Sequence, residues 1–206
     1  MAKAATLTST PAKPVAKTAS PAAEIKAAEK ALAKQIKTLA ALKRRAKPEA
    51  IEDAVFVGSG GTETKLSDLF GVHDELILIH NMGRSCVYCT LWADGFNGFR
   101  QHLEDRAAFV VISPDAPDKQ AEFAKSRGWT FKMLSDPKGR FSTPLGFGLD
   151  GGIYPGVSTF RRRKDGSIER IASSKFGPGD IYNPLFHLFD LLPGASADWS
   201  PKFRYG

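Results

Sequence analysis

The chain has 206 residues, a length that suits one domain of ordinary size with an extension and that can bury a core without disulfide crosslinks. Its two cysteines are too few for the disulfide framework of a small secreted scaffold, and no apolar run approaches the ~20 residues needed to span a membrane. The formal net charge of +7 is concentrated in residues 1–50, which carry +8, whereas residues 51–206 carry −1.

Residues 1–21 consist largely of Ala, Pro, Thr, Ser and Lys, and this mixture buries too little apolar surface to offset chain entropy. We therefore predict a disordered basic tail. The tail has no aromatic residue that could stack on a base, which favours a solvated segment over specific nucleic-acid binding. It has no continuous apolar core of the kind that secretory signals contain, so we expect a cytoplasmic protein, with organelle import as a minor alternative because the tail is poor in acids.

An amphipathic helix is predicted for residues 22–47, before Pro48. Apolar side chains recur there at three- and four-residue steps, at Ile25, Ala28, Leu32, Ile36, Leu39 and Leu42. Such a stripe either packs on the rest of the chain or pairs with another copy. A homodimer formed through residues 22–47 is therefore one expectation.

Residues 51–206 are predicted to form the main domain. In chain order the pattern predicts a strand at 54–57, a turn at 58–61, a strand at 62–65, a helical turn at 67–71, a strand at 75–81, a helix at 86–106, a strand at 107–113, a helix at 117–127, a strand at 131–135, an irregular stretch at 136–155, hairpin strands at 157–161 and 167–171, and a helix at 181–192. Ser67 is expected to cap the helical turn, and Asp165-Gly166 to form the hairpin turn.

This order predicts an α/β protein with a thioredoxin-like fold, in which helices flank a central mixed β-sheet. Two strand–helix–strand units give a parallel core, and the hairpin adds antiparallel strands. A βαβ half followed by a ββα half is the thioredoxin arrangement. The strands within residues 54–65 resemble the N-terminal β-hairpin elaboration of peroxiredoxins.

The two cysteines, Cys86 and Cys89, form a Cys-x-x-Cys pair at the predicted start of a helix that follows a buried strand. The free N–H groups and the dipole of a helix start favour a thiolate, so we expect a lowered pKa for Cys86. Cys89 lies about one helical turn further along, within reach of a mixed disulfide on Cys86. The placement predicts a redox pair in which Cys86 attacks and Cys89 resolves.

Two other interpretations of the pair stay open. Zinc needs about four ligands, and the histidines do not supply paired ligand spacing, at His73, His80, His102 and His187. Cysteines can also pack as inert, small apolar residues. No nucleotide, flavin or haem motif stands out, so no cofactor and no metal is expected.

The residues around the pair resemble a bacterial family of thioredoxin-like proteins catalogued as domain of unknown function eight-nine-nine. In that family, Cys-Pro-x-Cys-Ser-Phe-Trp-Ala-Asp-Gly-Phe corresponds to Cys86 through Phe96 here. Two further matches are the strand 155–160, with Pro-Gly-Val-Ser-Thr-Phe, and the end of the chain at 188–193, with Leu-Phe-Asp-Leu-Leu-Pro. The resemblance spans roughly residues 54–199. It implies a thioredoxin fold and suggests thiol–disulfide chemistry without naming a substrate.

Two departures from the family patterns bear on that chemistry. The family's Pro after the first cysteine is Val87 here, which implies a different redox potential. Thioredoxins place a cis-proline before the strand that faces the cysteines; that position would be Ser158, and Pro155 lies earlier. The absence of the proline implies a different hold on a partner peptide.

Four neighbouring side chains are candidates for supporting roles. Arg84 could add positive potential near Cys86, and His80, at the end of the central strand, could tune the thiol or serve as a hydrogen-bonded structural residue. Asp94 is a candidate proton acceptor for Cys89, with the alternative that it caps a local break at Gly95. Trp92 is expected to pack.

The leading functional hypothesis is a thiol–disulfide oxidoreductase that acts on a protein or low-molecular-weight thiol or disulfide. A thiol peroxidase is a variant, although the peroxiredoxin pattern of Pro and Thr ahead of the cysteine is not matched by residues 81–85, which contain no Pro. The second class is a non-enzymatic thioredoxin-like binding module, in which the helix at 22–47 makes the contact.

Overall fold

The computed structural model describes residues 20–206, so the predicted tail at 1–21 lies almost entirely outside the described residues. The chain divides into two compact units, one ending at Leu42 and the other running from Lys43 to Gly206. No helix within residues 20–206 is long and apolar enough to cross a membrane.

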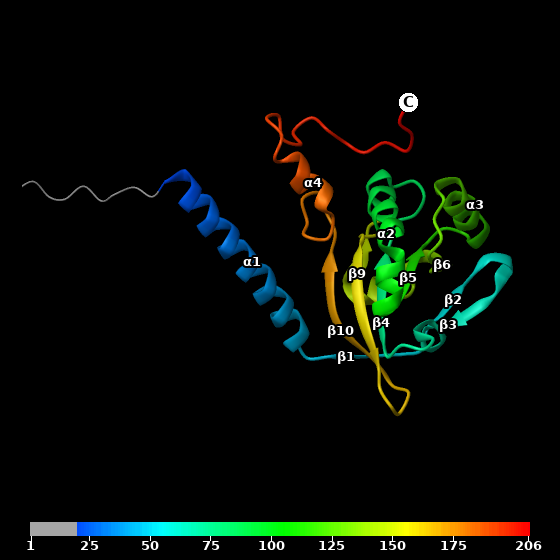
Figure 1. Cartoon of the computed structure of the whole chain (residues 1–206). Helices are drawn as coiled ribbons and strands as arrows, with labels where there is room; N and C mark the ends of the chain where they lie inside the picture. The colour runs from blue at the N-terminus through cyan, green and yellow to red at the C-terminus, as the bar shows by residue number, and fades with distance from the viewer. Residues whose placement is uncertain (1–19) are drawn as a thin grey trace, which may run out of the picture. The chain divides into compact units, whose positions relative to one another are not determined.

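Helix α1 spans Pro21–Arg45, close to the predicted range of 22–47 (Figure 1). Its apolar residues share one face because they are spaced three and four apart. The last turn carries Lys43, Arg44 and Arg45, whose charges are favourable at the carbonyl end of a helix.

The second unit is built on an eight-stranded mixed sheet (Figure 1). Its strands lie in the order β1 (Glu49–Ile51), β10 (Ile168–Lys175), β9 (Gly156–Arg162), β4 (Glu75–His80), β5 (Ala108–Ser113), β6 (Lys132–Ser135), β2 (Val55–Val57) and β3 (Glu63–Lys65). β4, β5 and β6 run parallel, and the other neighbours pair antiparallel. A separate ribbon joins β7 (Gly148–Leu149) and β8 (Gly152–Ile153). The sheet confirms the α/β thioredoxin-like fold, and β2–β3 is the expected N-terminal hairpin.

The core forms one apolar cluster on each face of the sheet. The central strand β4 shows the alternation: Leu76 and Leu78 belong to one cluster, whereas Ile79 belongs to the other. The Ile79 cluster takes side chains from three helices, α2 (Val87–Arg106), α3 (Pro117–Arg127) and α4 (Pro184–Phe189). Figure 1 shows α2 lying in front of β4 and β5. The start of α2 therefore lies close to the carboxyl end of β4, where the cysteines are.

Most predicted elements are confirmed within a few residues, but strand β1 was missed. Its three residues, Glu49–Ile51, show no alternation long enough to predict a strand. They form a strand because β10 offers an unpaired edge, and Ile51 pairs with Ile168.

Two local predictions are wrong. The helical turn spans Leu66–Phe70, and Ser67 does not cap it, because the Ser67 hydroxyl donates to Asp53 over 2.8 Å. The C-terminal helix is also shorter than residues 181–192. It begins at Pro184, after an Asn183 cap, and ends at Phe189, because Asp180 holds the preceding residues in a loop.

The stretch predicted as irregular, residues 136–155, contains short ordered pieces, including the ribbon β7–β8 and two helical turns at 137–139 and 143–147. Asp136 holds the beginning of this stretch through the backbone N–H groups of Phe141 and Ser142. A single buried carboxylate thus orders a segment that shows no hydrophobic period.

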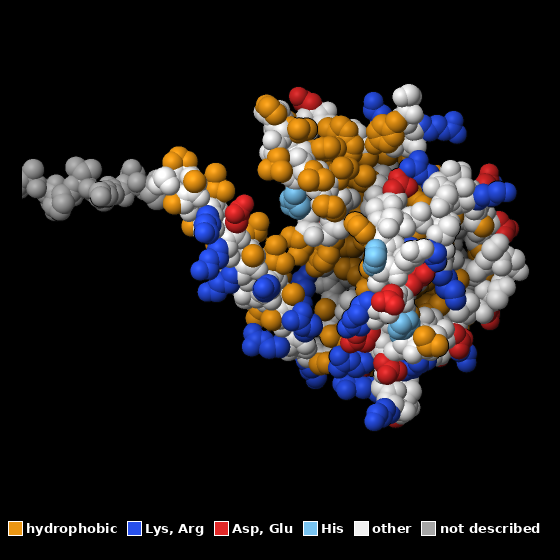
Figure 2. All heavy atoms as spheres, viewed as in Figure 1, with side chains coloured by type: hydrophobic (Ala, Val, Ile, Leu, Met, Phe, Trp, Pro, Cys, Tyr) orange, Lys and Arg blue, Asp and Glu red, His pale blue; other side chains and the backbone are white. Residues whose placement is uncertain are grey.

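The basic hairpin between β9 and β10 is charge-compensated. Arg106 and Arg161 both pair with Glu75, at 2.7 and 3.3 Å, and Arg163 pairs with Glu169 at 2.5 Å. Figure 2 shows red side chains among the blue ones near the foot of the molecule, where Figure 1 places this hairpin. These pairs leave little uncompensated charge for an anion site.

Candidate active site

The two cysteines lie where the central strand passes into the longest helix of the second unit. β4 ends at His80, and α2 begins at Val87 with Cys86 as its N-cap residue. The backbone N–H of Cys89 donates to Sγ of Cys86 over 3.1 Å, so sulfur occupies the position where a capping side-chain oxygen usually lies. Cys86 is half-buried, Cys89 is buried, and both are free thiols.

The two thiols have opposite pKa shifts. The Cys89 thiol and the backbone N–H groups of Cys89 and Tyr88 donate to Cys86, and these donors outweigh burial and lower the pKa of Cys86 to about 6. Donation to Cys86 and burial raise the pKa of Cys89 above its ordinary value, although the backbone N–H of Met82 also donates to it, over 3.4 Å. The arrangement favours one thiolate, on Cys86, next to one protonated thiol.

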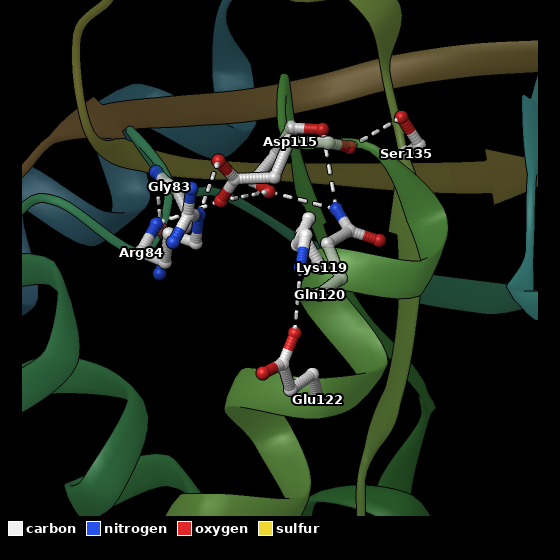
Figure 3. Close-up of polar contacts among 9 residues, drawn as sticks. Gly83, Arg84, Asp115, Lys119, Gln120, Glu122 and Ser135 are labelled. Carbon is white, nitrogen blue, oxygen red and sulfur yellow. Dashed lines mark hydrogen bonds and ion pairs between the residues drawn. The ribbon is translucent and has the colours of Figure 1, made fainter.

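The loop before Cys86 is held by Asp115, which follows the neighbouring parallel strand β5 (Figure 3). Asp115 Oδ2 accepts a hydrogen bond from the backbone N–H of Arg84 over 2.7 Å. Gly83 has a φ of 105°, and a Cβ at Gly83 would lie 2.7 Å from the same oxygen. Glycine is therefore required for the loop to approach the carboxylate. The hydroxyl of Ser135 holds Asp115 in turn, by donating to its carbonyl over 2.7 Å.

Arg84 lies in this loop, but its charge is directed to Asp115. Its Nε lies 3.9 Å from Asp115 Oδ1, and its side chain is 55% exposed (Figure 3). The groups that lower the pKa of Cys86 are donors on α2, and Arg84 is not among them.

Trp92 lies one turn beyond Cys89 and packs, as expected. It is buried, its ring lies 6.2 Å from that of Phe176 in a stacked orientation, and its Nε1 donates to Asp180 over 3.2 Å. Asp180 also accepts from the backbone N–H groups of Gly177 and Tyr182, at 3.0 and 2.7 Å. Asp180 therefore fixes the loop after β10 against α2.

A cavity of about 420 Å³ lies beside the cysteine pair. Helix α2 supplies one wall with Tyr88, Cys89, Trp92 and Phe96, which recur at three- and four-residue steps on one face. Pro155, before β9, supplies part of the opposite wall. Cys86 also lines the cavity, so the nucleophile and the space for a substrate are adjacent.

Asp94 does not lie with the cysteines. Its carboxylate is paired with the guanidinium of Arg127 and accepts a hydrogen bond from Trp129 Nε1 over 2.8 Å. These contacts join α2 to the end of α3, and they account for the carboxylate without a proton-transfer role at Cys89. The alternative role, as a cap at a break, is wrong because α2 continues through Gly95 to Arg106.

His80 is a structural residue within a buried chain of hydrogen bonds. The Ser142 hydroxyl donates to Asp136 over 2.7 Å, so it accepts from His80 Nδ1 at 2.9 Å. His80 Nε2 then accepts from the Ser158 hydroxyl at 2.9 Å. Burial lowers the pKa of His80 to about 3, so the ring is neutral. With both ring nitrogens occupied, His80 has no free position with which to tune Cys86.

Ser158 lies away from the cysteines, and Pro155 lies near them. Ser158 pairs with Leu78, and its side chain is directed to His80, on the sheet face opposite Ile79 and α2. Pro155 lines the cavity together with Cys86. All peptide bonds in the described part of the chain are trans, Pro155 included. The sequence comparison with the thioredoxin proline therefore selected the wrong residue.

No group of three or more His, Cys, Asp or Glu side chains within residues 20–206 is arranged to hold a metal ion.

The sheet, its flanking helices and the cysteine pair at a helix start define a protein of thioredoxin-like fold. Residues 16–200 match the family described as bacterial protein of unknown function (DUF899), and the chain belongs to that family. The match confirms the resemblance seen in the residues around Cys86. No curated protein matches the chain in sequence.

Solved structures with a similar fold are peroxiredoxins. Peroxidoxin BcpB from Mycobacterium tuberculosis is 25% identical, with a TM-score of 0.53, over 74% of this chain and 97% of that one. Prx3 from Vibrio vulnificus, reduced and in complex with H₂O₂, is 14% identical, with a TM-score of 0.53, over 66% and 90% of the two chains. PrxQ from Xylella fastidiosa is 16% identical, with a TM-score of 0.53, over 62% and 84%.

Sequence reasoning missed three carboxylates that organise the site and its surroundings: Asp115, Asp136 and Asp180. A signal was available for the first two, because each follows a predicted strand of the parallel core within two residues. The carboxyl ends of parallel strands lie at one edge of a sheet, where loops meet. Asp180 had no such signal, because its partner Trp92 is distant in the sequence.

Proposed function

We propose that this chain is a thiol–disulfide oxidoreductase in which Cys86 is the nucleophile and Cys89 the resolving thiol. The Cys86 thiolate attacks one sulfur of a disulfide substrate; the substrate S–S bond breaks, and the departing thiolate takes a proton. Cys89 then loses its proton and attacks Cys86 Sγ, which forms the Cys86–Cys89 disulfide and releases the second substrate thiol. Two electrons pass to the substrate, and an external dithiol restores the pair.

The observation that carries this proposal is the divergence of the two thiols. With a pKa of about 6, Cys86 is mostly thiolate at neutral pH, and Cys89, with a raised pKa, stays protonated until a mixed disulfide forms. Two inert, packed cysteines would show burial without donors directed at one sulfur, because burial alone raises the pKa of a thiol.

The test is the rate of alkylation of each thiol as a function of pH. In Cys89→Ser, which keeps a hydroxyl donor beside Cys86, we expect alkylation of Cys86 to rise with a midpoint well below the ordinary thiol pKa of ~8.5. In Cys86→Ser, Cys89 should react slowly across the same range. The proposal fails if Cys86 is unreactive in the folded protein, or if mild oxidation of the wild type does not join Cys86 to Cys89.

A thiol peroxidase is the second candidate, supported by the similarity to a peroxidoxin. The Cys86 thiolate would attack a peroxide oxygen, release an alcohol or water and become a sulfenate, and Cys89 would then displace water to give the same disulfide. Arg84, paired with Asp115, supplies no cation at Cys86. Peroxide consumption by the reduced protein, compared with disulfide reduction at equal concentrations, separates the two activities.

The remaining parts of the proposal concern organisation. We propose residues 51–206 as the redox domain, cytoplasmic in location, where a dithiol stays reduced, and residues 22–47 as a segment for self-association. A non-enzymatic binding module is the competing interpretation. It predicts unchanged function in Cys86→Ser and loss of function on deletion of residues 22–46, the reverse of the redox expectation.

A further inference from the structure

The cavity beside Cys86 has walls that are almost wholly apolar, and this property bears on the substrate. Its volume of about 420 Å³ falls within the range of small-molecule sites. All of its lining residues lie between positions 79 and 178, inside the second unit. Besides the α2 stripe, the apolar contributions come from Ile79, Met82, Leu149, Pro155, Phe176 and Pro178.

The polar side chains of the wall are already engaged elsewhere. The carbonyl oxygen of Asn81 accepts from the backbone N–H of Gly83 over 2.7 Å, both nitrogens of His80 are hydrogen-bonded to serines, and Trp92 Nε1 donates to Asp180. Apart from the cysteines, only Tyr88 and Tyr154 add further polar atoms to the wall.

The wall contains no Lys, Arg, Asp or Glu. Arg84 pairs with Asp115 and is not part of the lining. Lys175 holds its amino group 5.0 Å from the centre of the Tyr154 ring, but it is an exposed residue outside the lining. An anionic substrate that approached the Cys86 thiolate through this cavity would lose hydration without gaining an ion pair, which is unfavourable.

We propose that this cavity binds an apolar organic group of an uncharged, low-molecular-weight disulfide and presents its sulfur to Cys86. This inference rests on the proposed function. Cys86 attacks the sulfur that carries the bound group R, the other thiol R′SH leaves with a proton, and R stays in the cavity as a mixed disulfide. Attack by Cys89 on Cys86 Sγ then releases RSH and leaves the Cys86–Cys89 disulfide.

Two features of the cavity favour a small molecule over an extended peptide. An extended peptide binds by backbone hydrogen bonds to a free strand edge, but β9 and β4 are both paired on either side. Pro155 and Pro178, on the wall, have no N–H to offer. The site therefore offers side-chain surface in a cavity rather than a row of backbone donors.

The first test compares two aromatic disulfides of similar size and different charge. Dipyridyl disulfide is neutral near pH 7, whereas dithiobis(nitrobenzoic acid) carries two carboxylates. Each rate with the reduced protein is divided by the rate of the same reagent with free mercaptoethanol, which removes intrinsic reactivity. We expect the normalised rate to favour the neutral reagent by about tenfold or more. Equal normalised rates, or faster reaction of the dianion, would overturn the inference.

A rim variant tests whether the preference comes from the cavity. Leu149 lines the cavity and is 51% exposed, so Leu149→Glu adds a carboxylate there without burying it fully. The matched control is Val72→Glu, at an exposed residue that does not line the cavity. We expect Leu149→Glu to remove most of the preference for the neutral reagent and Val72→Glu to retain it. A preference that is unchanged in Leu149→Glu contradicts the inference; thermal unfolding shows that both variants are folded.

A binding measurement separates this inference from the redox proposal. Dipyridyl sulfide has one sulfur in place of two and cannot react with a thiol. Calorimetry on Cys86→Ser should show saturable binding at one site, weakened at least about tenfold in the Leu149→Glu, Cys86→Ser double variant. Absence of saturable binding overturns the cavity assignment even if Cys86 is reactive. Binding to a protein whose Cys86 proves unreactive overturns the redox proposal, and with it the disulfide substrate, but not the apolar site.

Discussion

Cys86 and His80 lie at the same end of the central strand, six positions apart in the sequence, yet their environments are opposite. Cys86 is half-buried, and donors at the start of α2 lower its pKa to about 6. His80 is fully buried between two serines, and burial lowers its pKa to about 3. Both pKa values fall, but the Cys86 shift favours a charged nucleophile, whereas the His80 shift favours a neutral ring.

The difference teaches that distance from a reactive group does not identify a partner in chemistry. Alternation along β4 directs His80 to the sheet face opposite α2, with Leu76 and Leu78. Its hydrogen bonds join β4 to β9 and to the segment that Asp136 orders. The comparison thus separates a residue that holds the end of the strand from one that uses that end.

The largest expected effect comes from replacing each residue and measuring disulfide reduction. Cys86→Ser should lower turnover of a disulfide substrate to the uncatalysed background, because a serine hydroxyl is not ionised at neutral pH. His80→Gln, which keeps a donor and an acceptor, should retain turnover within about threefold, because His80 takes no part in the chemistry. Loss of turnover in a folded His80→Gln variant would contradict the comparison.

The next effect is a pH-dependence of stability that belongs to His80. Below pH 6.5 the unfolded chain binds a proton at His80 that the folded chain does not, so the free energy of unfolding falls with falling pH. The slope from this group is about 1.4 kcal/mol per pH unit, down to its folded pKa of about 3. Above pH 6.5 the contribution is constant.

Urea unfolding of the wild type and His80→Gln at about pH 7 and pH 4.5 measures this effect. The wild type should lose roughly 2 to 3 kcal/mol more than the variant between the two conditions. Subtracting the variant removes the contribution of the carboxylates, which titrate in both proteins. Equal losses in the two proteins would show that His80 is accessible to protons in the folded state.

A smaller effect tests the donor that Cys89 provides. The Cys89 thiol is the largest cause of the lowered pKa of Cys86, so Cys89→Ala should raise the Cys86 pKa by about one unit or more, toward ~8.5. Cys89→Ser keeps an O–H donor and should raise it less. Alkylation rates of Cys86 against pH give both values. An unshifted midpoint in Cys89→Ala would assign the lowered pKa to the helix start alone.

Much of the fold could be predicted because its elements carry local signals. The apolar runs of β4 and β5, the Pro and Gly at the two ends of α3 and the Asp-Gly turn each depend on neighbouring residues. Strand β1 and the segment 136–155 could not be predicted, because a distant strand edge and one buried carboxylate order them. Their determinants are tertiary, so no periodic pattern marks them.

The candidate site divides in the same way. The placement of Cys86 and Cys89 follows from a strand, a loop and a helix that are contiguous in the sequence. The partners of Arg84, Asp94 and Ser158 come from other elements: Asp115, Arg127 and His80. Sequence adjacency assigned these three side chains to the cysteines, whereas each is satisfied by a residue that sequence alone does not bring near.

The smallest expected effect concerns Asp115, which holds the loop before Cys86. Asp115→Asn keeps an oxygen for the Arg84 N–H but removes the negative charge, and we expect a loss of about 1 kcal/mol in the free energy of unfolding. Alkylation of Cys86 should slow by less than about threefold, because the donors that lower its pKa lie on α2. Glu122→Gln, which breaks an exposed pair with Lys119 in the same region (Figure 3), is the matched control and should change neither quantity measurably. If Asp115→Asn instead moves the Cys86 midpoint as far as Cys89→Ala does, the loop rather than the helix start sets the pKa, and the contrast between Cys86 and His80 would then depend on the neighbouring strand β5.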